Sequence, residues 1–168
     1  VFSVLGLVAP VIYVSGLVLF LYWVIRWRWG YASPMLVLLL LGGMDLFDAC
    51  VHAFGTAGTG GFSSRNLSIG AYNSAYIDIV VGVFMILFGV NFSLYYLILL
   101  GNIRTALRTE ELRWFLGIIA FAVLTIAVDI RNLYGGVGHA LRYSFFQVTS
   151  IISTTGFATA DFNLWPEY

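Results

Sequence analysis

Threonine and glycine residues gather at two places in the chain, 95 positions apart. Thr59-Gly60-Gly61-Phe62 closes one apolar amphipathic segment, and Thr154-Thr155-Gly156-Phe157 closes another. Backbone carbonyls and threonine hydroxyls can replace the hydration shell of a potassium ion without a fixed charge, and glycine permits the backbone angles that turn carbonyls inward. Neither loop contains a carboxylate, which argues against a divalent-cation site. The repeat therefore predicts an ion-selectivity filter lined by Thr59, Gly60, Gly61, Thr154, Thr155 and Gly156.

Four further side chains are expected to support these loops. Phe62 and Phe157 close the two motifs themselves. Asn91 lies inside a long apolar run close to Gly89, where we expect it to bond backbone groups rather than the ion. Gln147 precedes the second motif, and we expect it to brace the pore helix on which it lies against a neighbouring segment.

The composition is that of an integral membrane protein. Of the 168 residues, 61% are hydrophobic and only 10% are charged, which lies outside the range of soluble domains. Eight basic and eight acidic side chains cancel, so no net field favours nucleic acid.

Asp129 and Arg131 are expected to pair at the outer end of a span. Cys50 has no second cysteine for a disulfide and no metal-ligand neighbours, so we expect it to be a packing residue.

Apolar runs long enough to cross a hydrocarbon core, about 20 residues, alternate with shorter ones. We expect an all-α integral membrane protein built from repeats of span, re-entrant pore helix, filter loop and span, as in a potassium-channel-like pore. The run over 74–101 exceeds one span, which implies a tilted or broken helix. The predicted boundaries are an apolar span of uncertain origin over 1–29; a pore repeat over 30–101, with an outer helix, a pore helix over 45–56, a filter over 57–63 and an inner helix over 74–101; a connector over 102–111; and a partial second repeat over 112–168, with an outer helix over 112–130, a pore helix over 138–153 and a filter over 154–158.

The connector predicts the orientation of the chain in the membrane. It contains Arg104 and Arg108, and the positive-inside tendency puts such a connector in the cytoplasm. The spans on either side then emerge on the outer face, which makes both filter loops extracellular. The segments 45–56 and 138–153 cross only about half a bilayer at roughly 1.5 Å per residue, and re-entrant backbone is tolerated where protein surrounds it. The carbonyl end of each half-helix would favour a cation at the loop.

Longer strings surround the two loop motifs. The first is Gly42-Gly43-Met44-Asp45-Leu46-Phe47-Asp48-Ala49, followed by His52-Ala53-Phe54-Gly55-Thr56-Ala57-Gly58 and then by the first motif, and the second runs from Phe145-Phe146-Gln147-Val148 to Trp165-Pro166. From Gly42 to the C-terminus, roughly three quarters of the chain, these strings resemble the Trk/Ktr/HKT superfamily of potassium transporters. They are most similar to the second and third repeats of the Trk-type pore subunit. The first 29 residues do not match, because Arg26, Arg28 and Pro34 interrupt the outer helix of that family.

The resemblance implies a subunit with four span-loop-span repeats around one pore and one glycine per repeat at the filter, here Gly61 and Gly156. It implies uptake of potassium rather than sodium in a multi-pass protein of a bacterial-type inner membrane. It further implies homodimers on a cytoplasmic ring of nucleotide-binding regulatory subunits, which the connector would face. One repeat and half of another are not expected to conduct alone, so the remaining repeats and the lipid membrane are expected partners. Neither a resident cofactor nor an enzymatic reaction is expected.

Several polar residues near the first loop have local interpretations. Asp45 and Asp48 are expected to cap the amino end of the first pore helix, where free amide hydrogens attract carboxylates. His52 lies one turn after Asp48, and a local hydrogen bond between them is expected. Arg65 is interpreted as a solvated loop charge, with a brake on cation entry as the alternative.

Three other functions agree with parts of the sequence. Gly58-Thr59-Gly60-Gly61 resembles a nucleotide-binding loop, but no strand precedes it. An intramembrane hydrolase could use Ser63 as nucleophile and His52 or His139 as base, although Ala158 occupies the matching position of the second loop. The remaining alternative is a truncated or non-conducting membrane scaffold.

Overall fold

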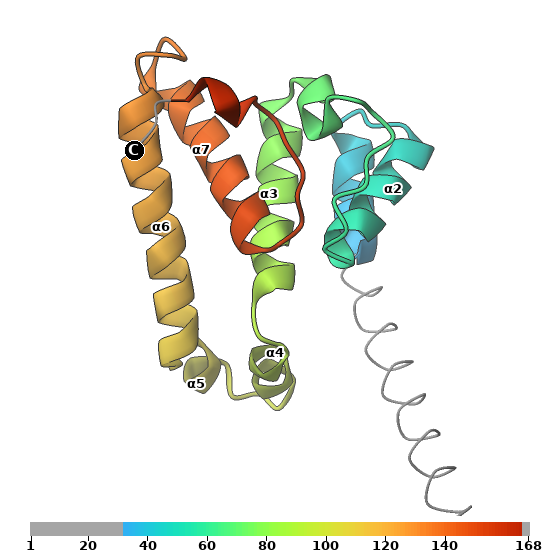
Figure 1. Ribbon diagram of the computed structural model, residues 1–168. Helices are drawn as coiled ribbons and strands as arrows, with labels where there is room; N and C mark the ends of the chain where they lie inside the picture. Colours follow the sequence, from blue (N-terminus) through green and yellow to red (C-terminus); the bar gives the residue numbers. More distant parts are fainter. Residues whose placement is uncertain (1–31, 166–168) are drawn as a thin grey trace, which may run out of the picture.

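The computed structural model describes residues 32–165, and all regular elements in this part are helices (Figure 1). The apolar span expected over 1–29 lies outside the described residues. In chain order the elements are the helix Ala32–Leu41, α2 (Leu46–Ala57), the 3-10 helix η1 (Ser68–Tyr72), α3 (Ala75–Gly89), α4 (Phe92–Leu99), α5 (Ile103–Arg108), α6 (Glu110–Ile130), α7 (Val137–Ile152) and the 3-10 helix η2 (Phe162–Leu164). The all-helical expectation is confirmed for the described residues.

Helices α6, α7 and α3 lie side by side, and α2 packs against α3 on the side away from α7 (Figure 1). The two half-length helices α2 and α7 are therefore separated by α3. The main apolar core lies between these elements and includes Ala53, Val81, Phe146 and Phe157, all of which are buried. Short α4 and α5 lie at the opposite end from η1 and η2 (Figure 1).

The long helix predicted over 74–101 is broken. Helix α3 ends at Gly89, and the axis turns by 93° before the next segment, Ser93–Leu99. Asn91 lies in this break, where its Oδ1 accepts a hydrogen bond from the Ser93 amide over 3.0 Å and its Nδ2 donates to the Glu111 carboxylate over 3.0 Å. It is exposed. Asn91 is thus not deep in a span, as the sequence suggested, but caps α4 and ties the break to α6.

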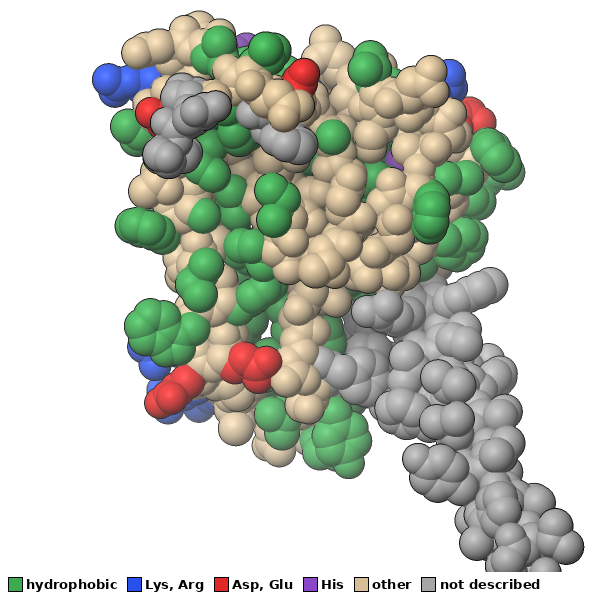
Figure 2. Space-filling model, viewed as in Figure 1, with side chains coloured by type: hydrophobic (Ala, Val, Ile, Leu, Met, Phe, Trp, Pro, Cys, Tyr) green, Lys and Arg blue, Asp and Glu red, His purple; other side chains and the backbone are tan. Residues whose placement is uncertain are grey.

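One described helix, α6, is long and apolar enough to cross a membrane, and the bent α3–α4 pair is a second if it counts as one span. Only 17% of the apolar 18-residue stretch of α6 is buried inside the protein. Large apolar side chains such as Trp114 and Phe121 therefore face outward. Charged side chains gather at the two ends of the molecule, and the belt between them is uncharged on the face shown in Figure 2. This distribution suits a protein surrounded by lipid.

The two ends of α6 differ in their polar contacts. Glu110 begins the helix. At the other end, Asp129 and Arg131 do not pair with each other. Within residues 32–165 the ion pairs are Asp48 with Arg65 and Asp78 with Arg142. The prediction for Asp129 and Arg131 is wrong because the helix continues to Ile130, and residues two apart on a helix do not face each other.

Candidate functional site

Two loops of the same construction follow α2 and α7. We call residues 58–63 the first glycine loop and residues 153–158 the second glycine loop. Their first amides fold back onto the preceding helix, and each bond recurs 95 positions later. In the first loop, the amides of Gly58, Thr59 and Gly60 donate to the carbonyls of Phe54, Thr56 and Gly55, respectively. In the second loop, the amides of Ser153, Thr154 and Thr155 donate to the carbonyls of Thr149, Ile151 and Ser150, and all six distances lie within 2.8 to 3.1 Å. The sequence repeat is thus a repeat of backbone structure.

The two loops also share an unusual pattern of backbone angles. Thr59 and Gly61 have φ values of 51° and 63°, and Thr154 and Gly156 have values of 57° and 89°. The residue between them, Gly60 or Thr155, lies outside this left-handed region. Left-handed angles cost a residue with a side chain roughly 1–2 kcal/mol, so a threonine held there indicates a constraint. Alternation of the sign of φ rotates successive peptide planes, so that their carbonyl oxygens can face one side.

The two loops touch each other through their backbones. A Cβ atom added at Gly61 would lie 2.1 Å from the carbonyl oxygen of Thr155 and 3.3 Å from the carbonyl carbon of Gly156. No real side chain fits at such a distance. Gly61 therefore needs to be glycine for two reasons, its positive φ and this close approach. The tertiary structure brings together the two motifs that the sequence separates by 95 positions.

Side-chain hydroxyls near the loops are used within the protein. Thr59 donates to the Gly58 carbonyl over 2.8 Å. Thr155 is buried and shares a hydrogen bond of 2.8 Å with the Ser153 hydroxyl. These two hydroxyls are therefore engaged, whereas Gly60, Thr154 and Gly156 are exposed. Backbone carbonyls and the exposed Thr154 hydroxyl are the oxygen donors that the loops could offer to a cation.

The phenylalanines that close the two motifs lie in different surroundings. Phe157 is 1% exposed and its ring packs against α2, where a Cβ added at Gly55 would lie 3.2 Å from its Cζ. Its carbonyl accepts a hydrogen bond of 2.6 Å from Ser150. Phe62 is 78% exposed. Gly55 and Ser150 occupy matching positions, so glycine admits the ring of the second loop where serine fastens its own loop.

His52 and Gln147 also occupy matching positions, and both fasten the segment that leaves the loop. His52 Nε2 lies 2.9 Å from the Ser63 hydroxyl, and its Nδ1 lies 2.7 Å from the Asp48 carbonyl oxygen. The expected local bond to Asp48 is confirmed, with the backbone as the acceptor. Gln147 Nε2 donates to the Ala160 carbonyl over 2.8 Å. Gln147 thus braces α7 against the segment that follows the second glycine loop.

A buried carboxylate, Asp48, organises the segment after the first glycine loop. It accepts hydrogen bonds from the Ser64 hydroxyl over 2.5 Å, from Arg65 Nε over 2.9 Å and from the Tyr72 hydroxyl. Asp48 therefore does not cap α2, and Arg65 is not a free solvated charge. Asp45 holds the N-cap position without a side-chain bond to the helix amides. The sequence interpretation failed here because the partners lie 16 to 24 positions away.

The same contacts shift the titration of two groups in this segment. Hydrogen bonds to Tyr72 and then to Asp48 raise the pKa of the Arg65 guanidinium. Burial, followed by the hydrogen bond to Asp48, raises the pKa of the Tyr72 hydroxyl. Both groups therefore keep their protons at neutral pH, and the network stays intact.

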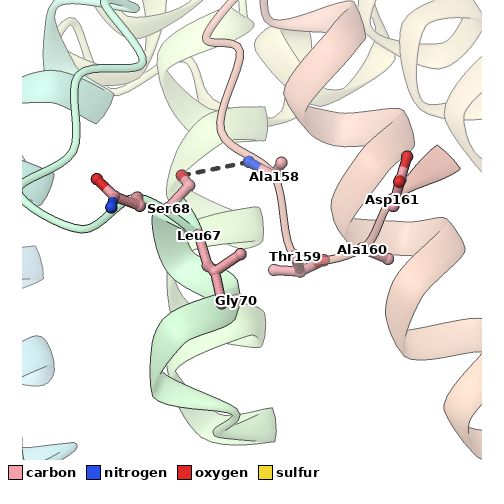
Figure 3. Close-up of a pocket in the computed structure, with 8 residues that line it drawn as sticks. Leu67, Ser68, Gly70, Ala158, Thr159, Ala160 and Asp161 are labelled. Atoms are coloured by element: carbon pink, nitrogen blue, oxygen red, sulfur yellow. Dashed lines mark hydrogen bonds between the residues drawn. The ribbon is translucent and has the colours of Figure 1, made fainter. Parts of the chain in front are cut away.

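The segments that leave the two loops meet around a small cavity. The Ser68 hydroxyl accepts a hydrogen bond from the Ala158 amide over 3.3 Å (Figure 3), and the Gly70 amide donates to the Ala158 carbonyl over 3.1 Å. A cavity of about 380 Å³ opens beside this contact, with Thr159 and Asp161 in its wall. The first repeat is thereby clamped to the second beyond the loops as well as at them.

The sequence interpretation missed two charged residues, Asp78 on α3 and Arg142 on α7. Arg142 Nε lies 2.6 Å from Asp78 Oδ2. The available signal was the placement of ionisable residues beside long apolar runs, where they are usually paired and functional. Cys50 is a free, half-buried thiol. No group of three or more His, Cys, Asp or Glu side chains in the described part of the chain is arranged to hold a metal ion.

Comparison with known proteins places these features in a family. The family model TrkH, described as a cation transport protein, matches residues 2–168, so the match includes the first 29 residues, where the sequence motifs predicted none. The Trk system potassium uptake proteins TrkH and TrkG of Escherichia coli K12 are 34% and 36% identical over 131 and 135 residues. Each alignment covers 76% of this chain and 27% of the relative.

A solved structure shows the same arrangement of helices. The crystal structure of the potassium transporter TrkH from Vibrio parahaemolyticus superimposes with a TM-score of 0.76 at 29% sequence identity. The superposition covers 80% of this chain and 30% of that protein. The chain therefore spans about a quarter to a third of the length of the proteins it resembles.

Proposed function

The chain belongs to the TrkH family of cation transport proteins, and from this membership we propose that it contributes two of the four loops of a potassium-selective filter. Potassium passes in dehydrated form, and the carbonyls of Thr59, Gly60, Gly61, Thr154, Thr155 and Gly156 replace its water. The named relatives in Escherichia coli are potassium uptake proteins. The proposed cargo is K⁺, and no chemical reaction takes place.

The direct approach of the two glycine loops is the observation that carries this proposal. Gly61 lies against the Thr155 carbonyl, and both loops alternate the sign of φ. Two loops with matching backbone at one place are what a ring of carbonyls around an axis requires. Ordered carbonyl rings bind a monovalent cation without a fixed negative charge.

The proposed topology follows from charge and helix length. Helices α2 and α7 act as re-entrant pore helices whose carbonyl ends face the filter. The connector that contains Arg104 and Arg108 lies in the cytoplasm, and both glycine loops lie on the outer side. The remaining repeats of the parent subunit complete the ring, with Phe62 as one contact point because its ring is exposed. A homodimer on a cytoplasmic nucleotide-binding regulatory ring is the proposed assembly.

The hydrolase alternative has a close geometric counterpart but is not the function of this chain. Ser63 and His52 are within hydrogen-bond distance, as in a nucleophile and base pair. His52 is fully buried, and its other ring nitrogen faces a backbone carbonyl rather than a carboxylate. The chain belongs to a family of transporters, not enzymes. The contact between Ser63 and His52 fastens the first glycine loop.

The filter assignment predicts a loss of selectivity on substitution of Gly156. In the full-length protein that contains this chain, Gly156→Ser should lower the ratio of potassium to sodium uptake, because a side chain at a left-handed position shifts the carbonyls of the second loop. Rubidium-tracer uptake into proteoliposomes, with sodium as competitor, measures this ratio.

Gly43 provides a matched control for this experiment. Its φ is 86°, against 89° for Gly156, and neither residue has an atom within 4 Å of an added Cβ. Gly43→Ser introduces the same backbone strain outside the loops and should leave the ratio unchanged. Equal ratios for both variants and the unsubstituted protein would contradict the filter assignment. Absence of uptake by an intact, folded protein would favour a non-conducting scaffold.

A further inference from the structure

A buried ion pair joins the inner helix of the first repeat to the half-helix of the second. Asp78 on α3 and Arg142 on α7 lie 64 positions apart, and their side chains are 2% and 15% exposed. Within residues 32–165, Asp78 Oδ1 is buried and has no hydrogen-bond partner. Removing two charges from water costs several kcal/mol per ion, which a single contact rarely recovers as stability. The pair therefore calls for a role other than stabilisation.

The pair stands at one end of a line of contacts along α3 and α7. One turn further along, a Cβ added at Gly82 would lie 2.4 Å from Cε1 of Phe145, so the ring fills the notch left by the glycine. At the far end, a Cβ added at Gly89 would lie 3.5 Å from the Ser153 Cβ. Residue numbers rise in the same direction on both helices along this line.

The line ends where the second glycine loop begins. Ser153 directly precedes Thr154, the first left-handed residue of that loop. The helix and the loop that follows it are joined by backbone hydrogen bonds from Thr154 and Thr155 to the last turn of α7. Any sliding of α7 along α3 is therefore passed on to the loop. A slip of one helical turn would move it by about 5.4 Å.

Apolar contacts alone allow several positions of one helix along another, because ridges and grooves recur along both surfaces. A charged pair allows only one, since any slip leaves both charges buried without a partner. Fixing register is the best-attested use of buried polar groups. The Asp78–Arg142 pair lies at the end of this line of contacts that is opposite the loop, where it can set the position of the whole of α7.

We propose that Asp78 and Arg142 are positioning residues that fix the depth of the second glycine loop relative to the first. The carbonyls of the two loops then lie at matching heights around one axis. The inference rests on the proposed function, because it takes the two loops to be parts of one filter. It assigns to the pair a role in ion selectivity, although neither residue contacts the ion.

A crosslink at the Gly89–Ser153 end of this line of contacts measures the register of α7 along α3 directly. The Gly89 to Ser153 separation suits a disulfide, whose Cβ atoms lie about 3.5–4.5 Å apart. In a full-length protein in which Cys50 and any other native cysteine are replaced, the pair Gly89→Cys and Ser153→Cys should crosslink readily under mild oxidation. Asp78→Asn or Arg142→Gln should each lower the crosslinking rate roughly fivefold or more, which is within the range of coupling between contacting residues.

The same single substitutions, without the added cysteines, should lower potassium over sodium selectivity in rubidium uptake. Arg142→Lys keeps the charge but loses the planar donor geometry, and it should give intermediate crosslinking if Arg142→Gln does not fold. The proposal is overturned if Arg142→Lys and either Asp78→Asn or Arg142→Gln show the same crosslinking rate and the same selectivity as the unsubstituted protein. It is also overturned if these variants crosslink more slowly but keep the selectivity of the unsubstituted protein. Gly156→Ser in parallel separates the two ideas. If it lowers selectivity and the Asp78 and Arg142 variants do not, only the positioning role fails; if it has no effect, the filter assignment fails.

Discussion

At the scale of single residues, glycine meets different constraints at two matching positions of the glycine loops. Gly61 has a positive φ and also faces the Thr155 carbonyl, whereas Gly156 has a positive φ and open space around it. The same residue type in the same motif is therefore required by one constraint at Gly156 and by two at Gly61. Gly55 and Ser150 show a similar division, since one admits a ring and the other donates a hydrogen bond.

This difference predicts unequal effects on stability. Gly156→Ala should cost roughly 1–2 kcal/mol, which is the cost of a left-handed angle for a residue with a Cβ. Gly61→Ala should cost more, because its Cβ would also push the backbone of the second loop away. Thermal unfolding of the purified protein in detergent compares the two variants. A larger loss for Gly156→Ala would contradict the close approach of the loops at Gly61.

At the scale of elements, each half-helix is fastened to the segment that leaves its own loop. The first repeat uses a charged network in which Asp48 binds Ser64, Arg65 and Tyr72, while the second uses the neutral amide of Gln147. The two repeats thus reach the same loop geometry with different side-chain chemistry. Each set of hydrogen bonds holds the segment after a glycine-rich loop against the half-helix that precedes the loop.

Loss of the Asp48 carboxylate should release the segment after the first loop. Asp48→Asn removes the ion pair with Arg65, and a hydrogen bond to a charged group contributes roughly 1.5–3 kcal/mol. Trypsin cleavage after Arg65 should accelerate by roughly tenfold or more, since cleavage follows the population of the open form. Cleavage kinetics on the purified protein measure this effect.

Asp129→Asn is the control for that experiment. Asp129 is exposed and forms no ion pair with a residue in the described range 32–165. Its substitution should leave cleavage after Arg65 unchanged. Equal cleavage rates in Asp48→Asn and the unsubstituted protein would show that the network does not hold this segment.

At the scale of the whole molecule, an uncharged belt separates two charged ends on the face shown in Figure 2. One end has the glycine-loop exits with η1 and η2, and the other has α4, α5 and the first turn of α6 (Figure 1). Arginine at the second end, including Arg104 and Arg108, predicts that this end is cytoplasmic. The two ends should therefore react with reagents on opposite sides of the membrane.

Cysteine labelling tests this orientation. In a full-length protein in which Cys50 and any other native cysteine are replaced, Asn66→Cys should react with a membrane-impermeant maleimide added to intact cells. Thr105→Cys should react only after permeabilisation, because the proposed topology puts the connector on the inner side. Both positions are exposed, so access rather than burial decides the result. Labelling of Thr105→Cys in intact cells would reverse the proposed topology.

Sequence alone determined the all-helical membrane class of the protein, the positions of the two half-length helices and the repeat of the two loops, but not the place at which the helix over 74–101 breaks. The spacing of apolar residues and the composition suffice to predict these features, because the features depend on residues close together in the chain. The helix predicted over 45–56 is α2 at Leu46–Ala57, and the helix predicted over 138–153 is α7 at Val137–Ile152. The family membership also follows from these local motifs.

Only the tertiary structure decided which side chains meet. The partners of Asp48, the contact between Gly61 and Thr155, and the pairing of Asp78 with Arg142 join residues 16 to 94 positions apart. Neighbours in sequence suggested other roles for Asp48 and Arg65, and none for Asp78 and Arg142. The reason is physical: a buried charge or a close backbone approach is satisfied by whatever packing brings within reach, and spacing along a single chain does not contain that information.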